Sequence, residues 1–362
     1  ETLTPKPHIV APKWNMSRSE VIKIIKKLKS NSSGGPCGIE NVVFQYLVKK
    51  DEEYQFTRHL MAYLKDVVVN GLPEIAHKML RRARGVALAK PGDKGYDTDV
   101  RPLCLFDSTT RLEDNIIWKN VPIEQRLKAM GASQLVEAPD GIGRANIALD
   151  VVENVLQRTG DRALVIKDAS NAFNAMDRGH VYELVRRKVP DFHNWYLAIY
   201  GGEIEVQFDE EHVCGMTQGG SQGMPSSMPI YSMGKQDVEW RIERETKRRM
   251  AIENVKCSES KYAVTKSTGQ NGLLSVAEGA KECDGCLYEE NPLAVMTIEE
   301  ERDLMKEEGA NYSGRDPWDD RRALDRFTDT NGRIEFKTDY ADDGVVMMPD
   351  VMVPTYMTVT EE

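Results

Sequence analysis

The sequence predicts an α+β fold in which a small antiparallel sheet is packed against helices. Three observations support this prediction. Apolar residues recur at helical spacing in three segments, several short runs have strand composition, and strand-like residues flank a hairpin signal at Asp343-Gly344. The chain has 362 residues, of which 40% are hydrophobic, so it is long enough for two or three domains with a substantial core.

The first predicted helix covers residues 17–28. Ser17 is a suitable N-cap, and Glu20 follows it at the spacing of a capping box. Val21, Ile24, Ile25 and Leu28 share one face of this helix, which predicts that this face is buried. Apolar spacing predicts two further helices, over residues 55–69 and 147–157.

Short strands are expected at residues 85–89 and 101–105, joined by a segment rich in Pro, Gly and Asp at residues 91–95. A third, buried strand is expected at residues 163–166. The last two strands flank Asp343-Gly344, a dipeptide that favours a two-residue hairpin turn.

The net charge of −10 is concentrated in one segment. Residues 267–320 contain 14 acidic and 4 basic side chains, whereas residues 13–94 contain 16 basic and 8 acidic ones. The N-terminal third is therefore positively charged enough to contact phosphates. The alternative is that its lysines only solvate helix faces.

Two acidic motifs are candidates for metal chemistry. Asp168 follows the buried strand at residues 163–166, where a carboxylate can bind Mg²⁺ or simply cap the next helix. Asp342 and Asp343 would lie side by side at the tip of the predicted hairpin. Adjacent carboxylates repel each other unless cations neutralise them, so a pair of Mg²⁺ ions is the natural partner. An ordinary acidic turn is the alternative.

These motifs resemble the two metal-binding motifs of reverse transcriptases. The residues that carry the resemblance are DASNAFN at 168–174 and YADD at 340–343. The first motif, followed by Asp177-Arg178, is most similar to the non-LTR retrotransposon branch. The resemblance implies that Asp168, Asp342 and Asp343 bind two Mg²⁺ ions, for which Mn²⁺ is an alternative. It also implies that the Ala169 carbonyl completes the metal shell and that Tyr340 contacts the substrate.

Other segments of the chain match further parts of the same family. Phe173 corresponds to the aromatic residue that packs under the sugar and excludes a 2′-hydroxyl, although a buried Phe at this place is more often core. Gln222-Gly223, followed by Pro225, resembles the Gln-Gly-x-Pro element that supports the incoming nucleotide. Arg101 and either Lys90 or Lys94 resemble the cations of the fingers hairpin that hold the triphosphate.

The resemblance implies the fingers and palm of a right-hand polymerase, with fingers at residues 14–135. The palm would comprise residues 136–233 and a catalytic hairpin at residues 332–350, separated by an acidic insertion at residues 234–331. The insertion is expected to project away from the nucleic acid. Only 19 residues follow Asp343, so the thumb is expected to be missing.

The expected function is RNA-directed DNA polymerisation, with an RNA template, a DNA primer and dNTPs as partners. The alternatives are an RNA-templated RNA polymerase and an inactive remnant that binds nucleic acid. The first residue is not Met, which suggests a fragment, and the oligomeric state is open. No apolar run is long enough to span a membrane, and an intracellular location is expected because the six cysteines resemble free thiols. Cys283 and Cys286 have the spacing of half a zinc site, for which Cys257 is the nearest third thiolate.

Overall fold

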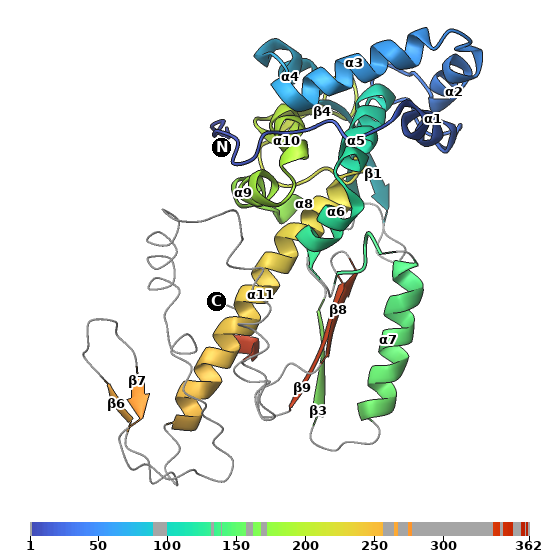
Figure 1. The fold of residues 1–362 in the computed structure, drawn as a ribbon. Coiled ribbons are helices and arrows are strands. Elements are labelled where there is room, and N and C mark those ends of the chain that lie inside the picture. Colours follow the sequence, from blue (N-terminus) through green and yellow to red (C-terminus); the bar gives the residue numbers. More distant parts are fainter. Residues whose placement is uncertain are drawn as a thin grey trace. The chain divides into compact units, whose positions relative to one another are not determined.

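The part of the chain that the structure describes combines helices with three small sheets, which agrees with the expected mixture of helix and strand (Figure 1). The computed structural model describes residues 2–89, 100–131, 134–138, 140–156, 162–167, 172–255, 264–266, 274–276, 336–340, 343–349, 356–358 and 360. The chain divides into two compact units. Unit 1 comprises Glu1–Ala145, Asp168–Gln236 and Asp339–Asp343, and unit 2 comprises Asn146–Lys167, Asp237–Thr338 and Gly344–Glu362.

Unit 1 contains most of the helices and one mixed sheet. Its helices are α1 (Arg18–Lys26), α2 (Asn41–Lys50), α3 (Gln55–Asn70), α4 (Glu74–Leu80), α5 (Ser108–Asn120), α6 (Ile123–Met130), α8 (Ala172–Ala175), α9 (Arg178–Lys188), the 3-10 turn η1 (Pro190–Phe192) and α10 (His193–Tyr200). Its strands are β1 (Arg82–Ala89), β2 (Val100–Phe106), β4 (Ile204–Gln207) and β5 (Val213–Met216).

The capping box at the start of α1 is confirmed. The Ser17 side chain accepts the Glu20 backbone N–H, and the Glu20 carboxylate accepts the Ser17 N–H at 2.8 Å. These bonds satisfy donors that the first helical turn leaves unpaired. Val21, Ile24 and Ile25 are buried as expected, whereas Leu28 lies beyond the end of α1 and is only partly buried. The helix predicted at residues 55–69 is also confirmed, as α3.

The four strands of unit 1 follow the order β2-β1-β4-β5. β1 and β2 pair antiparallel from Ala83↔Phe106 to Ala89↔Val100, which confirms the two strands predicted on either side of the turn-rich segment. β1 pairs parallel with β4, and β4 pairs antiparallel with β5. β2 is therefore an edge strand, and one row of its backbone groups is free to bond to other parts of the chain.

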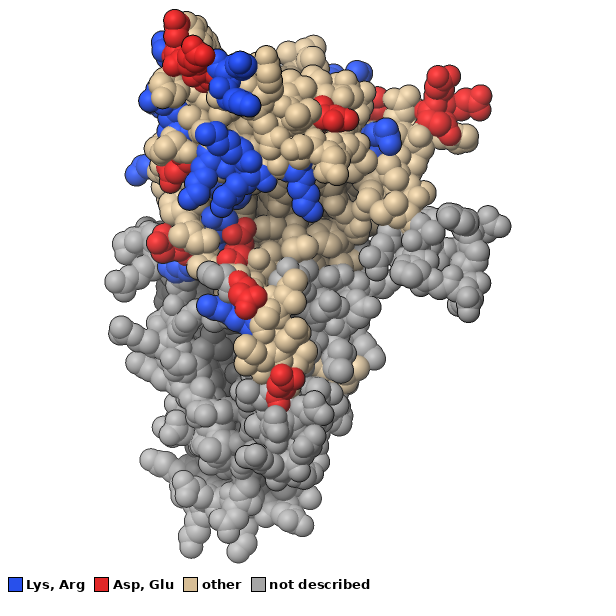
Figure 2. All heavy atoms as spheres, turned by 90° about the vertical axis from the view of Figure 1, so that its right-hand side faces the viewer, with Lys and Arg blue, Asp and Glu red and all other residues tan. Residues whose placement is uncertain are grey.

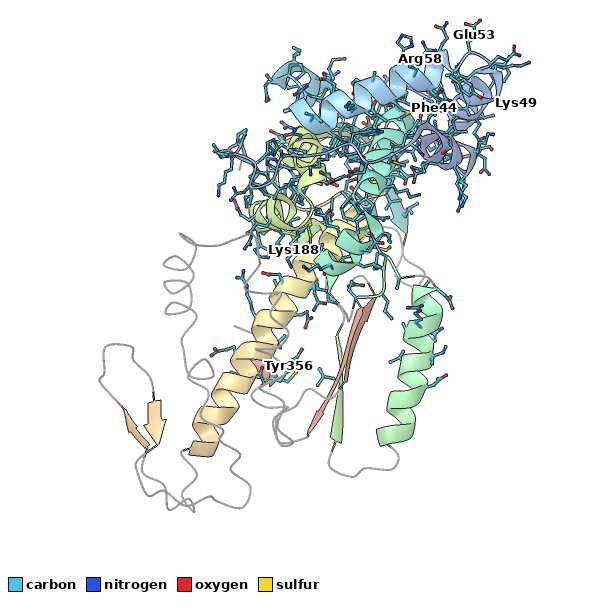
Figure 3. All side chains as sticks on the ribbon, viewed as in Figure 1. Phe44, Lys49, Glu53, Arg58, Lys188 and Tyr356 are labelled. Atoms are coloured by element: carbon cyan, nitrogen blue, oxygen red, sulfur yellow. The ribbon has the colours of Figure 1, made fainter. Side chains whose placement is uncertain are left out.

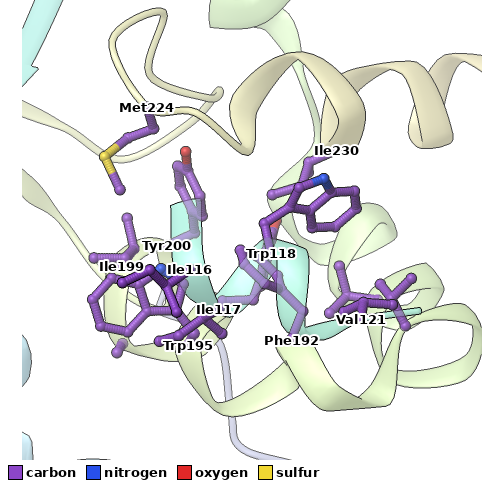
Figure 4. Packing of buried hydrophobic residues seen from close by; sticks show 14 of the residues in the cluster. Ile116, Ile117, Trp118, Val121, Phe192, Trp195, Ile199, Tyr200, Met224 and Ile230 are labelled. Atoms are coloured by element: carbon purple, nitrogen blue, oxygen red, sulfur yellow. The ribbon is translucent and has the colours of Figure 1, made fainter. Parts of the chain in front are cut away.

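A buried cluster around α5 forms the centre of the core of unit 1. Figure 4 shows Ile116, Ile117 and Trp118 of α5 together with side chains of η1 and α10. Met224 and Ile230, which come from a loop and from the helix that follows it, belong to the same cluster. The loop that carries Met224 is thus attached to the core by this apolar side chain.

Unit 2 contains a three-stranded sheet, a short hairpin and parts of two long helices. Its strands are β3 (Arg162–Lys167), β6 (Val264–Lys266), β7 (Leu274–Val276), most of β8 (Phe336–Tyr340) and most of β9 (Asp343–Pro349). The three-stranded sheet has the order β3-β9-β8. Helices α7 (Gly141–Leu156) and α11 (Ser227–Val255) both begin in residues of unit 1 and end in residues of unit 2.

The predicted terminal hairpin is present, but its turn was predicted at the wrong residues. β8 ends at Tyr340 and β9 begins at Asp343, so Ala341 and Asp342 connect the strands and Asp343-Gly344 belongs to β9. The physical reason is that β9 also pairs with β3. Gly344 is the ladder partner of Lys167, and this additional pairing extends the strand through the Asp-Gly signal.

The expected insertion at residues 234–331 has no break at its start, because Gly234 lies within α11. Within this range, β6 and β7 pair antiparallel from Val264↔Val276 to Lys266↔Leu274. Cys257, Cys283 and Cys286 lie outside the described residues. Within unit 2, the Tyr356 hydroxyl donates to the Glu239 carboxylate on α11 at 3.5 Å (Figure 3). None of the described helices has the length and apolar character needed to cross a bilayer.

Candidate active site

The two acidic motifs are brought together through the backbone of the three-stranded sheet. β3 and β9 pair antiparallel from Arg162↔Pro349 to Lys167↔Gly344. Asp168 is the next residue after Lys167, and Asp343 directly precedes Gly344. Asp168, Ala169 and Asp342 lie outside the described residues, and Asp343 and Tyr340 are described only as parts of strands β9 and β8. The register nevertheless brings one end of each motif to the same end of the paired strands β3 and β9.

The chemistry of the donor set at this sheet edge fits Mg²⁺. Carboxylate oxygens are the hard ligands that Mg²⁺ and Mn²⁺ take in proteins. Elsewhere, among the residues that the structure describes, no group of three His, Cys, Asp or Glu side chains is arranged to hold a metal ion.

Phe173 lies on the one-turn helix α8 and is half-buried. Its ring is 4.9 Å from the ring of Tyr231 on α11, at an interplanar angle of 36°. One side of Phe173 thus packs against the core, while part of the side chain remains accessible. This arrangement is compatible with contact to a substrate and equally with a role in packing.

The Gly-rich loop, defined here as residues 215–227, bonds directly to the segment that carries Phe173. The Gly220 N–H donates to the Phe173 carbonyl at 2.6 Å, and the Gly219 N–H donates to the Met176 carbonyl at 3.0 Å. Gly219 has φ of 79°, and a Cβ there would overlap the backbone carbonyl oxygen of Asn174. Only glycine accommodates both the left-handed backbone and this close approach.

The second Gln-Gly pair of the loop lies against β2. The Ser221 hydroxyl donates to the Cys104 carbonyl at 3.0 Å, using a backbone acceptor of this edge strand. A Cβ at Gly223 would overlap the same carbonyl oxygen, so the loop can approach β2 only because residue 223 is glycine. Gln222 is partly exposed beside this contact.

The Gly-rich loop therefore connects two of the motifs proposed from the sequence. It touches α8 through Gly219 and Gly220, and it touches β2 through Ser221 and Gly223. Arg101 lies on β2 as the partner of Leu88, three residues before Cys104, which corresponds to about 10 Å along a strand. Only the backbone of Arg101 is described, and Lys90 and Lys94 lie outside the described residues.

Two buried charged side chains that sequence reasoning missed hold the ends of this loop. Arg178, which is 4% exposed, donates to the backbone carbonyls of Met216, Gln218 and Gly219. Asp114, on the buried helix α5, accepts the backbone N–H and the hydroxyl of Ser226, each at 2.7 Å. Asp177-Arg178 belongs to the segment that resembles the non-LTR branch, but the resemblance gave Arg178 no role. Nothing in the sequence around Asp114 marks it as buried.

Burial changes the ionisation of two neighbouring carboxyl groups on α5. Desolvation raises the pKa of Asp114 to about 6, and the hydrogen bonds from Ser226 and Trp195 oppose this shift. Desolvation raises the pKa of Glu113 to about 8, and a hydrogen bond with Tyr63 opposes this shift only in part. The difference reflects the number of donors, since Asp114 accepts three hydrogen bonds from Ser226 and Trp195.

Basic side chains gather on the described part of one face of the protein. Figure 2 shows Lys and Arg side chains next to one another on the face that lies on the right of Figure 1. Exposed basic residues of α1 and α2 include Lys23, Lys26, Lys49 and Lys50. A surface of this charge can attract phosphate groups, although acidic side chains lie beside it in the same view.

Comparison with known proteins adds no assignment. No protein-family model matches the chain, and no curated protein matches its sequence.

Proposed function

We propose that this chain is an RNA-directed DNA polymerase of a retroelement, which adds dNTPs to the 3′-hydroxyl of a DNA primer on an RNA template. The observation that supports this proposal most directly is the pairing of Lys167 with Gly344. A polymerase of this kind needs carboxylates from two distant parts of the chain at one place. The register of β3 and β9 brings the ends of the two acidic motifs to the same edge of one sheet.

In this proposal, Asp168, Asp342 and Asp343 hold two Mg²⁺ ions, and the Ala169 carbonyl adds a ligand. When bound, such ions activate the primer hydroxyl and neutralise charge on the triphosphate and leaving pyrophosphate. Arg101 and Lys90 bind the triphosphate, since guanidinium and ammonium groups pair strongly with phosphate oxygens. Tyr340, at the end of β8, contacts the substrate near the catalytic hairpin.

The Gly-rich loop and Phe173 would act on the nucleotide itself. Gln222 and Gly223 support the incoming nucleotide, and Phe173 packs against its sugar and leaves no room for a 2′-hydroxyl. The hydrogen bond from Gly220 to the Phe173 carbonyl supports a joint role, because it holds the two elements together. The fold class proposed for the chain is accordingly the fingers and palm of a right-hand polymerase.

A primer-extension assay tests the proposal. The full-length protein is incubated with Mg²⁺, an RNA template, a labelled DNA primer and either dNTPs or rNTPs. We expect extension with dNTPs that is lost in Asp168→Asn and retained in Asp177→Asn. Asp177 is a matched control because its carboxylate caps α9 by accepting the N–H groups of Gly179 and His180, and Asn is an equally good cap.

The outcomes separate the alternatives. Extension with rNTPs in place of dNTPs would identify an RNA-templated RNA polymerase. Binding of the primer–template without extension would identify a nucleic-acid-binding remnant. Equal loss of extension in Asp168→Asn and Asp177→Asn would contradict the assignment of Asp168 as a metal ligand.

A further inference from the structure

We propose that Arg178 and Asp114 are positioning residues that fix the two ends of the Gly-rich loop. By holding the loop in place, they set the enzyme's KM for dNTP and its discrimination against rNTP. This inference rests on the proposed function, in which the loop and Phe173 contact the nucleotide. Neither side chain is itself expected to touch the substrate. They act through backbone groups of the loop.

Arg178 fixes the N-terminal half of the loop. Its Nε donates to the Gly219 carbonyl at 2.8 Å, and its Nη2 donates to the carbonyls of Met216 and Gln218 at 3.1 and 3.3 Å. Its Nη1 donates to the Gly202 carbonyl at 2.8 Å, just beyond the end of α10. A planar guanidinium with five donors can bind several carbonyls at once in one fixed geometry, which lysine cannot do.

The constraint passes from Arg178 to Phe173 through the single peptide group that joins Gly219 to Gly220. Gly219 offers its carbonyl to Arg178 and its N–H to Met176, and the next residue, Gly220, donates to the Phe173 carbonyl. The backbone of Phe173 is therefore two hydrogen-bonded steps from the guanidinium. Movement of the loop would move the backbone from which the Phe173 ring projects.

Asp114 fixes the C-terminal half of the loop. Ser226 donates both its N–H and its hydroxyl to Asp114, and Trp195 Nε1 donates to the same carboxylate at 2.9 Å. Ser226 directly precedes α11, so this carboxylate lies at the N-terminus of a long helix, where negative charge is favourable. Gln222 and Gly223 are thus held between two buried groups of opposite charge.

The chain offers a matched control for each residue. Arg81 is a second buried arginine, and it also donates to backbone carbonyls, those of Leu197 and Ala198 at 2.7 and 2.9 Å. Glu113 is a second buried carboxyl group on α5, next to Asp114, and it interacts with Tyr63. Both controls are buried ionisable side chains, and none of these bonds involves the Gly-rich loop.

The first measurement does not depend on activity. Hydrogen exchange is followed by mass spectrometry in peptides that cover residues 215–230, for Arg178→Lys, Asp114→Asn, Arg81→Lys and Glu113→Gln. We expect exchange of the loop amides to increase by about tenfold in the first two variants and to stay near wild type in the controls, because local opening depends on local bonds. Unchanged loop exchange in both test variants would overturn the proposal.

The second measurement is single-nucleotide incorporation with dNTP and with rNTP. We expect Arg178→Lys and Asp114→Asn to raise the KM for dNTP by about tenfold, with a smaller change in kcat, because misplacement of a substrate-positioning group weakens productive binding. Arg178→Lys should also reduce the preference for dNTP over rNTP. If Arg178→Lys does not fold, Asp114→Asn carries the test through its effect on KM.

The results separate this inference from the proposed function. A wild-type protein that incorporates no nucleotide would overturn the proposed function. A wild type that is active, with test variants whose KM and sugar preference match those of Arg81→Lys and Glu113→Gln, would overturn the positioning role alone. Increased loop exchange without any kinetic change would show that Arg178 and Asp114 serve the fold only.

Discussion

Lys167 and Gly344 are ladder partners at the end of the antiparallel pair formed by β3 and β9. Their pairing matters because each is a direct sequence neighbour of a proposed metal ligand, Asp168 and Asp343 respectively. Side chains alternate between the two faces of a sheet, so a slip of one residue would turn the whole strand over. The register is therefore the structural relationship on which the proposed active site depends.

Asp342→Asn should abolish nucleotide incorporation without loss of stability. In the proposed site, the substitution removes a metal ligand and also relieves repulsion between adjacent carboxylates, so the melting temperature should be unchanged or slightly higher. Incorporation is measured by primer extension and stability by thermal unfolding. Asp209→Asn, at an exposed position between β4 and β5, is the control and should remain active. Near-normal incorporation by Asp342→Asn would refute the assignment.

Phe173→Ala should increase the use of rNTPs relative to dNTPs. If the ring excludes a 2′-hydroxyl, its removal creates room for one, and the loss of a half-buried aromatic side chain should cost about 2 kcal/mol of stability. Phe56→Ala is a suitable control, because Phe56 on α3 is also partly buried against the core. Unchanged sugar preference in a folded Phe173→Ala protein would mean that Phe173 is a packing residue.

Glu113→Gln should alter the pH dependence of stability. Burial raises the pKa of Glu113 from 4.5 to about 8, so the folded protein disfavours the charged form. Its contribution to stability is therefore complete below about pH 4.5 and is lost as the pH rises through about 8. The wild type should lose a few kcal/mol over this range, at about 1.4 kcal/mol per pKa unit.

Urea unfolding at several pH values measures this effect. Between about pH 5 and 8, the range set by the raised pKa of Glu113, the free energy of unfolding should change less with pH in the Glu113→Gln protein than in wild type. A parallel decline in both proteins would show that other groups account for the pH dependence.

Gly219→Ala should destabilise the protein more than Gly38→Ala. Both glycines have a left-handed backbone, with φ of 79° and 71°, so alanine carries a similar conformational cost of about 1 kcal/mol at each site. Only at Gly219 does the added Cβ also overlap a backbone oxygen, since nothing lies within 4 Å of a Cβ at Gly38.

Denaturant unfolding compares the two glycine variants. The excess cost at Gly219 should accompany a higher KM for dNTP, because the clash pushes the loop away from the segment that carries Phe173. Equal destabilisation of the two variants would indicate that the loop moves freely and is not fixed as described.

Local features of the fold were predictable where they depend only on residues that are close together in the sequence. The capping box at Ser17 and Glu20 specifies the start of α1, because both partners lie within one helical turn. The strands β1 and β2 were also predicted, since their composition and the turn between them are local properties. The candidate carboxylates could be named for the same reason, by their places at the ends of strand-like runs.

Features that depend on distant partners were not predictable. Strand β9 begins at Asp343 and includes the Asp-Gly dipeptide, because Gly344 pairs with Lys167 on β3, more than 170 residues earlier. The charge beyond Gly234 suggested a new segment, but Arg, Glu and Lys are good helix formers, and α11 continues to Val255.

The helix cap, the strand-forming runs and the candidate residues Asp168, Phe173, Asp342 and Asp343 could be named before the fold was known. The burial of Arg178 and Asp114 at the two ends of the Gly-rich loop became evident only from the folded chain. The physical reason is that burying a charge is unfavourable unless hydrogen-bond partners are already in place. Those partners are carbonyls and N–H groups from distant segments, which no local pattern of residues reveals.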